Sequence, residues 1–179
     1  MWLINLVENL LSVTRIEDGT MNLHMEAELM SEVVSEALRH VNRRREEHTI
    51  KVEPVDDFIM ARMDARLIIQ VIINIVDNAI KYTPAGSTIV VSVKKQNSIV
   101  TVEIADNGNG ISDEAKGNLF EMFYTANDGI GDSRRGLGLG LALCKSIIVA
   151  HGGTISVKDN TPSGAIFRFT LQAEEVILH

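Results

Sequence analysis

The sequence predicts an α/β domain preceded by one separate helix, because stretches with helical periodicity alternate with short β-prone stretches. Helical patterns occupy residues 2–16, 29–41, 64–82 and 137–150, and β-prone segments occupy residues 49–52, 58–61, 88–95, 99–105, 154–158 and 165–171. The composition is that of a globular protein, with 179 residues, 45% hydrophobic and 23% charged. We therefore expect one compact domain with an N-terminal appendage.

Charge and hydropathy exclude two classes of partner. The chain has 17 Lys+Arg against 24 Asp+Glu, a net charge of −7, which argues against nucleic acid. The most apolar segment, residues 67–76, is interrupted by Gln70 and Asn74, so we expect neither a membrane span nor membrane contact by this part of the protein. The single cysteine, Cys144, lies in an apolar helical run and is expected to be a small buried hydrophobe in a reducing compartment.

The first two helical patterns are amphipathic. Residues 2–16 have a wide apolar face that needs a partner helix and predicts self-association, and Glu17-Asp18-Gly19 provides a stop. Residues 29–41 form a second such helix, which ends in the charged run 43–47.

The remaining elements follow in order. Asp64 is placed to N-cap a helix that runs to about Tyr82, where Thr83-Pro84 stops it. Residues 88–95 and 99–105 alternate apolar and polar side chains and predict a hairpin. Residues 106–140 hold eight of the 13 glycines and are expected to be mostly loop. A helix over 137–150, ending at His151, and two strands complete the domain.

A polar stripe runs along the otherwise apolar helix of residues 68–82. It consists of Gln70, Asn74, Asp77, Asn78 and Lys81. The stripe could be only a wet face, but asparagine is a poor helix former, and two asparagines one turn apart favour a binding site. An asparagine carbonyl suits Mg²⁺, and a lysine suits phosphate groups. Tyr82 could present a flat face to a base, or equally serve the core.

Two glycine-containing segments add to this pattern. Residues 106–111 follow a strand and could be an ordinary turn; in a nucleotide pocket, the Asp106 carboxylate would accept from the exocyclic amine of adenine and repel the guanine carbonyl. Gly136, Gly138 and Gly140 open a helix, where backbone N–H groups can bind an anion. Their spacing is neither a Rossmann fingerprint nor a Walker A loop.

Together these segments resemble the N, G1, F and G2 boxes of sensor histidine kinases, which are ATP-binding domains of the gyrase, Hsp90, histidine kinase and MutL superfamily. The matching segments are NIVDNAIKYTP at residues 74–84, DNGNG at 106–110, LFEMFY at 119–124 and GLGLGL at 136–141. The resemblance covers about residues 29–171. It implies a Bergerat-type two-layer α/β sandwich, a mixed sheet with helices on one face, with ATP under a mobile lid.

The segment NLLSVTRIEDG at residues 9–19 resembles the end of the second helix of the family's dimerisation and phosphoacceptor hairpin. The resemblance therefore implies that residues 1–19 are the C-terminal part of that helix and residues 20–179 the catalytic ATP-binding domain.

The resemblance also implies roles for individual residues. Asn78 would hold Mg²⁺, Asn74 and Lys81 would approach the phosphates, Tyr82 would lie along the adenine, and Asp106 would bind its amine. The implied cofactor-binding set is Asn74, Asn78, Lys81, Tyr82, Asp106, Gly108, Gly110, Ile111, Phe120, Phe123, Gly136, Leu137, Gly138, Leu139 and Gly140. The implied catalytic set is Asn74, Lys81, Arg134 and Arg135.

Three departures from the family pattern affect these expectations. Thr125 stands where the family often has Arg, so Arg134 or Arg135 would supply the charge near the γ-phosphate. The last box, often Gly-Thr, is Gly164-Ala165 here. None of the five histidines is followed by the acidic residue and proline of a phosphoacceptor motif, so the target histidine is expected outside this chain. Apart from His151, the histidines are expected to face solvent.

The resemblance thus implies an ATP- and Mg²⁺-dependent protein-histidine kinase domain of a two-component system. Its partners would be the phosphoacceptor hairpin, through which the kinase forms a homodimer, and a response regulator. The domain would be the cytoplasmic part of a membrane-anchored sensor, with the potassium-responsive sensor kinases as one alternative within the family. The alternatives are an ATP-driven clamp and a nucleotide-sensing module without kinase activity. A clamp of the gyrase or MutL type has a glutamate base where this chain has Asn74, and a neutral amide cannot take a proton from water.

Overall fold

A seven-stranded mixed sheet with helices on one face forms the domain. The computed structural model describes residues 2–19, 22–41, 47–122, 124 and 140–175. The helices are α1 (Trp2–Glu17), α2 (Met30–Arg39), α3 (Ala65–Tyr82), α4 (Asp113–Asn118) and α5 (Gly140–Ala150). The strands are β1 (Glu26–Leu29), β2 (Thr49–Val52), β3 (Met60–Met63), β4 (Thr88–Gln96), β5 (Ile99–Asp106), β6 (Ile155–Asp159) and β7 (Ala165–Glu174).

The sheet is organised around its longest strand, β7. The strand order is β1-β3-β7-β5-β4-β2, and β6 also pairs with β7. One side of β7 pairs with β5, while the other side pairs with β6 over residues 165–169 and with β3 over residues 173–174. The β2–β4 pair is parallel, and the other pairs are antiparallel. The predicted two-layer α/β sandwich with a mixed sheet is therefore confirmed.

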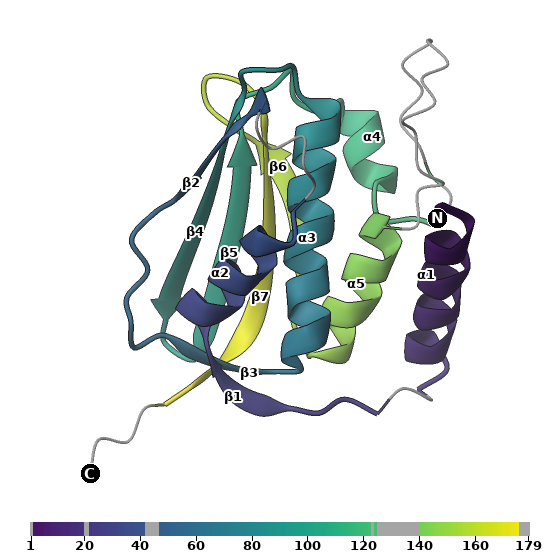
Figure 1. The fold of residues 1–179 in the computed structure, drawn as a ribbon, viewed down its shortest axis with the longest axis vertical. Helices are drawn as coiled ribbons and strands as arrows, with labels where there is room; N and C mark the ends of the chain where they lie inside the picture. Colours follow the sequence, from purple (N-terminus) through teal and green to yellow (C-terminus); the bar gives the residue numbers. More distant parts are fainter. Residues whose placement is uncertain (1, 20–21, 42–46, 123, 125–139, 176–179) are drawn as a thin grey trace.

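The core lies between the sheet and one layer of helices. Alternate residues of β5 and β7, such as Val102 and Phe169, are fully buried on the face toward the helices. Ile72 of α3 and Ile147 of α5 are fully buried in the same cluster. In Figure 1, helices α2, α3 and α5 lie side by side over this face.

Polar residues occupy the other face of the central strands. Arg168 of β7 forms an ion pair with Glu103 of β5, and Lys158 of β6 lies 3.9 Å from the same carboxylate. This alternation of apolar and charged positions explains why helices cover only one side of the sheet.

Helix α1 lies outside the helical layer, next to α5 (Figure 1). Its residue Ile16 packs on the core, whereas Val7, Leu10 and Leu11 are largely exposed. Among the described residues, no helix is both long and apolar enough to cross a membrane.

The N-terminus of α3 is joined to the C-terminus of α5 through buried polar groups. Asp64 occupies the predicted N-cap position, but its side chain does not cap the helix. Its Oδ2 accepts instead from the His24 backbone N–H at 3.1 Å and from Arg66 at 3.2 Å. Nε2 of His151 accepts from the Asp64 N–H at 3.0 Å, and Nδ1 donates to the Ile147 carbonyl at 2.7 Å. His151 thus follows α5 as predicted and also links the two helices.

Three predicted elements need correction. The helix predicted to begin at Leu29 begins at Met30, because residues 26–29 form the edge strand β1. Strand β3 begins two residues later than the predicted residue 58. The predicted loop of residues 106–140 contains helix α4, whose first-turn N–H at Ala115 is capped by Ser112 at 3.2 Å. The predicted helix start at residue 137 lies outside the described residues.

Candidate functional site

Three loops meet at one end of the sheet. The first loop follows α3, the second follows β5, and the third joins β6 to β7. A Cβ atom placed on Gly108 would lie 2.6 Å from Thr83, and one placed on Gly110 would lie 3.4 Å from the carbonyl oxygen of Gly164. The loops after α3 and between β6 and β7 therefore both contact the loop that follows Asp106.

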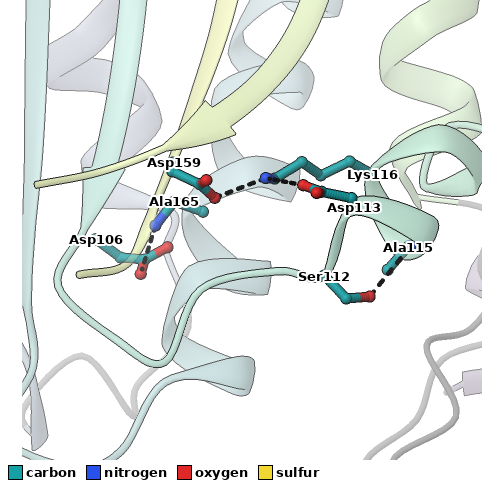
Figure 2. A network of polar contacts seen from close by, with 7 residues as sticks. All are labelled: Asp106, Ser112, Asp113, Ala115, Lys116, Asp159 and Ala165. Carbon is teal, nitrogen blue, oxygen red and sulfur yellow. Dashed lines mark hydrogen bonds and ion pairs between the residues drawn. The ribbon is translucent and has the colours of Figure 1, made fainter.

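Asp106 lies at the centre of this loop cluster and is 6% exposed. Its Oδ1 accepts hydrogen bonds from the N–H groups of Gly108 at 2.9 Å and Ala165 at 3.3 Å. Its backbone carbonyl accepts from the Asn160 side chain at 2.8 Å. Figure 2 shows the carboxylate beside Ala165. Both contacts involve Oδ1, and no described residue donates to Oδ2.

Gly164 must be glycine at its place beside Asp106. Its φ is +105°, and an added Cβ would lie 2.0 Å from the Asp106 carbonyl oxygen. Such a distance is a steric clash, and the positive φ disfavours any side chain. The family pattern Gly-Thr is Gly164-Ala165 here, so the required glycine is present and only the second residue differs. Ala165 still donates its backbone N–H to Asp106.

On α3, the two asparagines of the polar stripe have different surroundings. Asn74 Oδ1 accepts from Gln70 at 2.9 Å, while Asn74 Nδ2 is buried without a partner among the described residues. The neighbouring residue on α5 is Cys144, which is fully buried as predicted. Burial raises the pKa of the Cys144 thiol to about 12, and the Asn74 side chain partly opposes this shift. Asn78 is half-buried, and its side chain makes no hydrogen bond to another described residue.

Lys81 is the last residue of the stripe, and Tyr82 follows it at the C-terminus of α3. The Lys81 ammonium lies 5.3 Å from the centre of the Tyr82 ring, and Tyr82 is 57% exposed. An exposed aromatic face with a neighbouring cation is suited to a base and a phosphate group. The stripe and Tyr82 together thus offer side-chain amides, an ammonium group and a flat ring on α3.

Helix α4 follows the Asp106 loop and is joined to strand β6 by an ion pair. Lys116 lies 3.0 Å from Asp113 and 2.7 Å from Asp159 at the end of β6 (Figure 2). These two carboxylates, Asp159 first, raise the pKa of Lys116. Phe120, after α4, packs edge-on against Phe167 with ring centres 6.3 Å apart. Phe120 therefore anchors the segment to the core, and Ile111 at its start also packs on the core.

Several predicted site residues lie outside the described part of the chain. They are Phe123, Arg134, Arg135, Gly136, Leu137, Gly138 and Leu139. Gly140 is described and is the first residue of α5. The structure therefore bears on the predicted N and G1 segments and on only the edges of the predicted lid.

Three residues outside the predicted site set lie in or contact the loop that follows Asp106. Asn107 Oδ1 accepts from the Thr88 N–H at 2.8 Å and so fixes the start of the loop against β4. Thr83 and Asn160 contact the same loop. Their signal in the sequence was weak, because each acts through a residue distant along the chain. His48, expected to face solvent, is half-buried and lies 2.9 Å from Thr83 Oγ1.

These groups fit an adenine nucleotide. Asp106 Oδ2 is an acceptor that no described residue donates to, and the half-buried Asn78 and the Lys81 ammonium lie along α3. A cavity of about 550 Å³ lies beside α2, and one of about 630 Å³ lies between α1 and α5 with Phe120 in its lining. Neither is lined by Asp106 or by the polar stripe of α3.

Comparison with known proteins gives the family. The family model described as histidine kinase-, DNA gyrase B-, and HSP90-like ATPase matches residues 63–175. Sensor protein KdpD of Clostridium acetobutylicum is 48% identical over 173 residues, which are 97% of this chain and 19% of that protein. KdpD of Escherichia coli is 32% identical over 166 residues, 93% of this chain and 18% of that protein.

A solved structure agrees with this result. The Acinetobacter baumannii histidine kinase AdeS superposes with a TM-score of 0.78 at 29% identity, covering 97% of this chain and 79% of that one. The chain spans about a fifth of the length of the two KdpD proteins. These matches include the segments that carry the predicted N, G1 and G2 boxes, and they do not favour the clamp alternative. The chain therefore belongs to the family of histidine kinase-, DNA gyrase B- and HSP90-like ATPases, as an ATP-binding catalytic domain of the sensor histidine kinase type.

Proposed function

We propose that this chain binds Mg²⁺-ATP and presents the γ-phosphate to a histidine side chain that lies outside residues 1–179. The observation that supports this most directly is the Asp106 carboxylate. Two backbone N–H groups hold one of its oxygens, and the other has no partner among the described residues. Its loop contacts Thr83, directly after the stripe that carries Asn74, Asn78 and Lys81.

In this proposal the loops bind the base. Asp106 Oδ2 would accept from the exocyclic amine of adenine, because a carboxylate can only accept hydrogen bonds. Tyr82 would cover one side of the base with its exposed ring, and Ile111 would pack on the other. Gly108 and Gly110 would let the backbone come close to the ligand.

Helix α3 would bind the metal and the phosphates. Asn78 would coordinate Mg²⁺ through its side-chain oxygen, and Asn74 and Lys81 would approach the phosphates. The described residues contain no group of three or more His, Cys, Asp or Glu side chains that could hold a metal. Mg²⁺ at this site would therefore take most of its ligands from phosphate oxygens and water.

The G2 segment completes the proposed site. Gly136, Gly138 and Gly140 would act as hinges of a lid, with Leu137, Leu139, Phe120 and Phe123 beside the nucleotide, and Arg134 and Arg135 would neutralise charge near the γ-phosphate. Phosphoryl transfer depends mainly on alignment and charge neutralisation, so these groups would supply nearly all that it needs.

The relatives' names support a wider assignment. We assign residues 1–19 to the C-terminal part of a dimerisation and phosphoacceptor helix, and residues 20–179 to the catalytic domain. The parent protein would be a homodimeric, membrane-anchored sensor that phosphorylates itself and then a response regulator. The catalytic domain would lie on the cytoplasmic side, where ATP is found.

Phosphoryl transfer to a separate hairpin tests the kinase assignment. The chain is mixed with Mg²⁺, γ-labelled ATP and the parent protein's phosphoacceptor hairpin, made separately. We expect acid-labile label on the hairpin and none that stays on this chain. Label on the chain alone would contradict an external target, and ATP hydrolysis without transfer would favour a clamp.

Nucleotide preference tests the proposed role of Asp106. By calorimetry, Mg²⁺-ADP should bind more tightly than Mg²⁺-GDP, by about tenfold or more, because the guanine carbonyl would face the Asp106 carboxylate. Asp106→Asn should reduce this preference. Equal binding of the two nucleotides by the unmodified chain would contradict the proposal that Asp106 recognises adenine.

A further inference from the structure

His48 and Thr83 form a polar pair beside the proposed site, and the function proposed above gives His48 no role. Thr83 is the C-cap residue of α3 and follows Lys81 and Tyr82 directly. The backbone on both sides of His48 is paired to the turn after α3. The Glu47 carbonyl accepts from the Gly86 N–H at 2.7 Å, and the Thr49 N–H donates to the Ser87 carbonyl at 3.0 Å. His48 is therefore held against the end of the helix.

The hydrogen bonds of Thr83 determine the tautomer of neutral His48. The Thr83 hydroxyl has one proton, and it donates that proton to the Ala79 carbonyl at 2.6 Å. Toward His48 Nε2, at 2.9 Å, the hydroxyl can then only accept, so Nε2 carries the proton. Nδ1 is left as an acceptor, and it is buried without a partner among the described residues.

These contacts also fix the methyl group of Thr83. A threonine side chain adopts staggered rotamers, so a hydroxyl held between Ala79 and His48 determines where the methyl points. The methyl points at Gly108, where an added Cβ would lie 2.6 Å from Thr83 Cγ2. Gly108 in turn donates its N–H to Asp106 Oδ1. Contacts thus run from His48 through Thr83 and Gly108 to Asp106.

We propose that His48 is a positioning residue for the nucleotide site. It holds Thr83 in the rotamer whose methyl seats the Gly108 loop, and that loop aims the Asp106 carboxylate at the base. His48 itself touches no nucleotide. This inference rests on the proposed function, because it assigns to His48 the alignment of the group that recognises adenine.

Two pairs of variants separate positioning from general support of the fold. His48→Leu removes the donor to Thr83, whereas His48→Gln keeps an N–H donor near the position of Nε2. Thr83→Val keeps a methyl group and removes the hydroxyl, whereas Thr83→Ser keeps the hydroxyl and removes the methyl. We expect His48→Leu, Thr83→Val and Thr83→Ser each to weaken Mg²⁺-ADP binding about three- to tenfold, the effect of one lost neutral hydrogen bond or of a misplaced loop. His48→Gln should bind within about twofold of the unmodified chain.

Coupling between the residues gives the sharper result. In the Thr83→Val background, His48→Leu should cause no further loss of affinity, since the contact is already absent. With the hairpin present and the ATP concentration varied up to saturation, His48→Leu should raise the KM for ATP and leave kcat unchanged. In nucleotide-free chain, the NMR amide shift of Gly108 should change in His48→Leu and return in His48→Gln.

Each outcome supports the inference or contradicts it. If the unmodified chain binds no Mg²⁺-ADP, the proposed function fails, and the role of His48 in nucleotide binding fails with it. If that chain binds but His48→Leu binds equally well, or the Gly108 shift does not move, only the inference about His48 is overturned. Should His48→Leu fail to fold, Thr83→Val and Thr83→Ser decide, and unchanged affinity in both would overturn it.

Discussion

Asn74 and Asn78 are chemically identical and one helical turn apart, but their surroundings differ. The carbonyl oxygen of Asn74 accepts a hydrogen bond from Gln70, and its amide nitrogen is buried beside α5. The Asn78 side chain has no hydrogen-bonding partner among the described residues. A carbonyl without an internal partner can bind Mg²⁺ without breaking an existing hydrogen bond. We therefore expect the metal to depend on Asn78 more than on Asn74.

Replacement of Asn78 tests this expectation. Asn78→Ala should weaken the Mg²⁺-dependent part of ADP affinity by about tenfold or more, because it would remove the proposed side-chain ligand. The far-UV circular dichroism should not change, since alanine favours helix and the site is only half-buried. Calorimetry with and without Mg²⁺ measures the effect, with the exposed Asn118→Ala in α4 as control. Equal Mg²⁺ dependence in Asn78→Ala and the unmodified chain would place the ion elsewhere.

Candidate site residues could be predicted from the sequence where a residue type is unusual for the helix or strand in which it occurs. Asn74 and Asn78 are conspicuous because asparagine is rare in a buried helix, and Asp106 because a carboxylate ends an apolar strand. His48 was wrongly expected to face solvent. Its partner Thr83 is 35 positions away along the chain, so no local pattern shows the contact.

The joint between α3 and α5 depends on a neutral histidine. His151 donates through Nδ1 to Ile147 and accepts through Nε2 from the N–H of Asp64. A protonated ring would turn Nε2 into a donor facing another donor. Burial lowers the pKa of His151 from its ordinary value of 6.5, although the Ile147 carbonyl and the Asp64 carboxylate oppose this. The joint is therefore expected to weaken in acid.

The pH dependence of folding tests this joint. Since the pKa of His151 is lower in the folded chain, the unfolded chain binds the proton more readily. The stabilisation is complete above the ordinary pKa and is lost as pH falls from there toward the folded-state pKa. The urea concentration at the unfolding midpoint should be lower at about pH 5.5 than at about pH 7.5. This decrease should be smaller in His151→Gln than in the unmodified chain.

Two other groups check the assignment to His151. His24→Gln keeps the backbone N–H that binds Asp64, so it should behave as the unmodified chain does. Burial would raise the pKa of Asp64, but its hydrogen bonds from Arg66 and His24 lower it overall. The contribution of the Asp64 carboxylate to folding stability is thus lost only at a lower pH than the contribution of His151. An undiminished pH slope in His151→Gln would assign the effect to another group.

The turn between β6 and β7 should tolerate no side chain at Gly164. Gly164→Ala should destabilise the chain by at least about 1–3 kcal/mol, because the new Cβ meets the Asp106 carbonyl and the backbone has a positive φ. Gly117→Ala is the matched control, since Gly117 lies in α4 with nothing within 4 Å of an added Cβ. It should stabilise by about 0.5–1 kcal/mol. Thermal unfolding of both variants measures the difference, and equal effects would contradict the clash at Gly164.

Elements with a strong local pattern were predictable. Helix α3 and the β4–β5 hairpin match their predicted ranges within one residue at each end because long periodic runs specify them. The edge strand β1 has only four residues, of which Glu26 and Glu28 are acidic, and it depends on pairing with β3. Helix α4 has six residues, but its Ser112 cap and following acidic residues were a usable signal.

The arrangement of the sheet follows from packing between distant segments. Periodicity predicts which strands are half-buried, but it contains no information that β7 lies between β3 and β5. The two-layer architecture could be expected from the resemblance to sensor histidine kinases, and the structure and the family match confirm it. Helix α1 is the exception to this compact packing, since it contacts α5 and leaves Val7, Leu10 and Leu11 largely exposed.

The exposed face of α1 predicts how the chain associates. Without residues 1–19 the chain should stay folded, because the core consists of the sheet with α2, α3 and α5. The full chain should self-associate through the apolar face of α1, and the shortened chain should be monomeric. Sedimentation equilibrium measures both, and unfolding curves show whether the shortened chain keeps its core. Leu10→Gln with Leu11→Gln should also give a monomer, whereas the exposed Glu8→Gln should associate as the unmodified chain does. A full chain that stays monomeric, or a shortened chain that still associates, would assign that face of α1 no role in assembly.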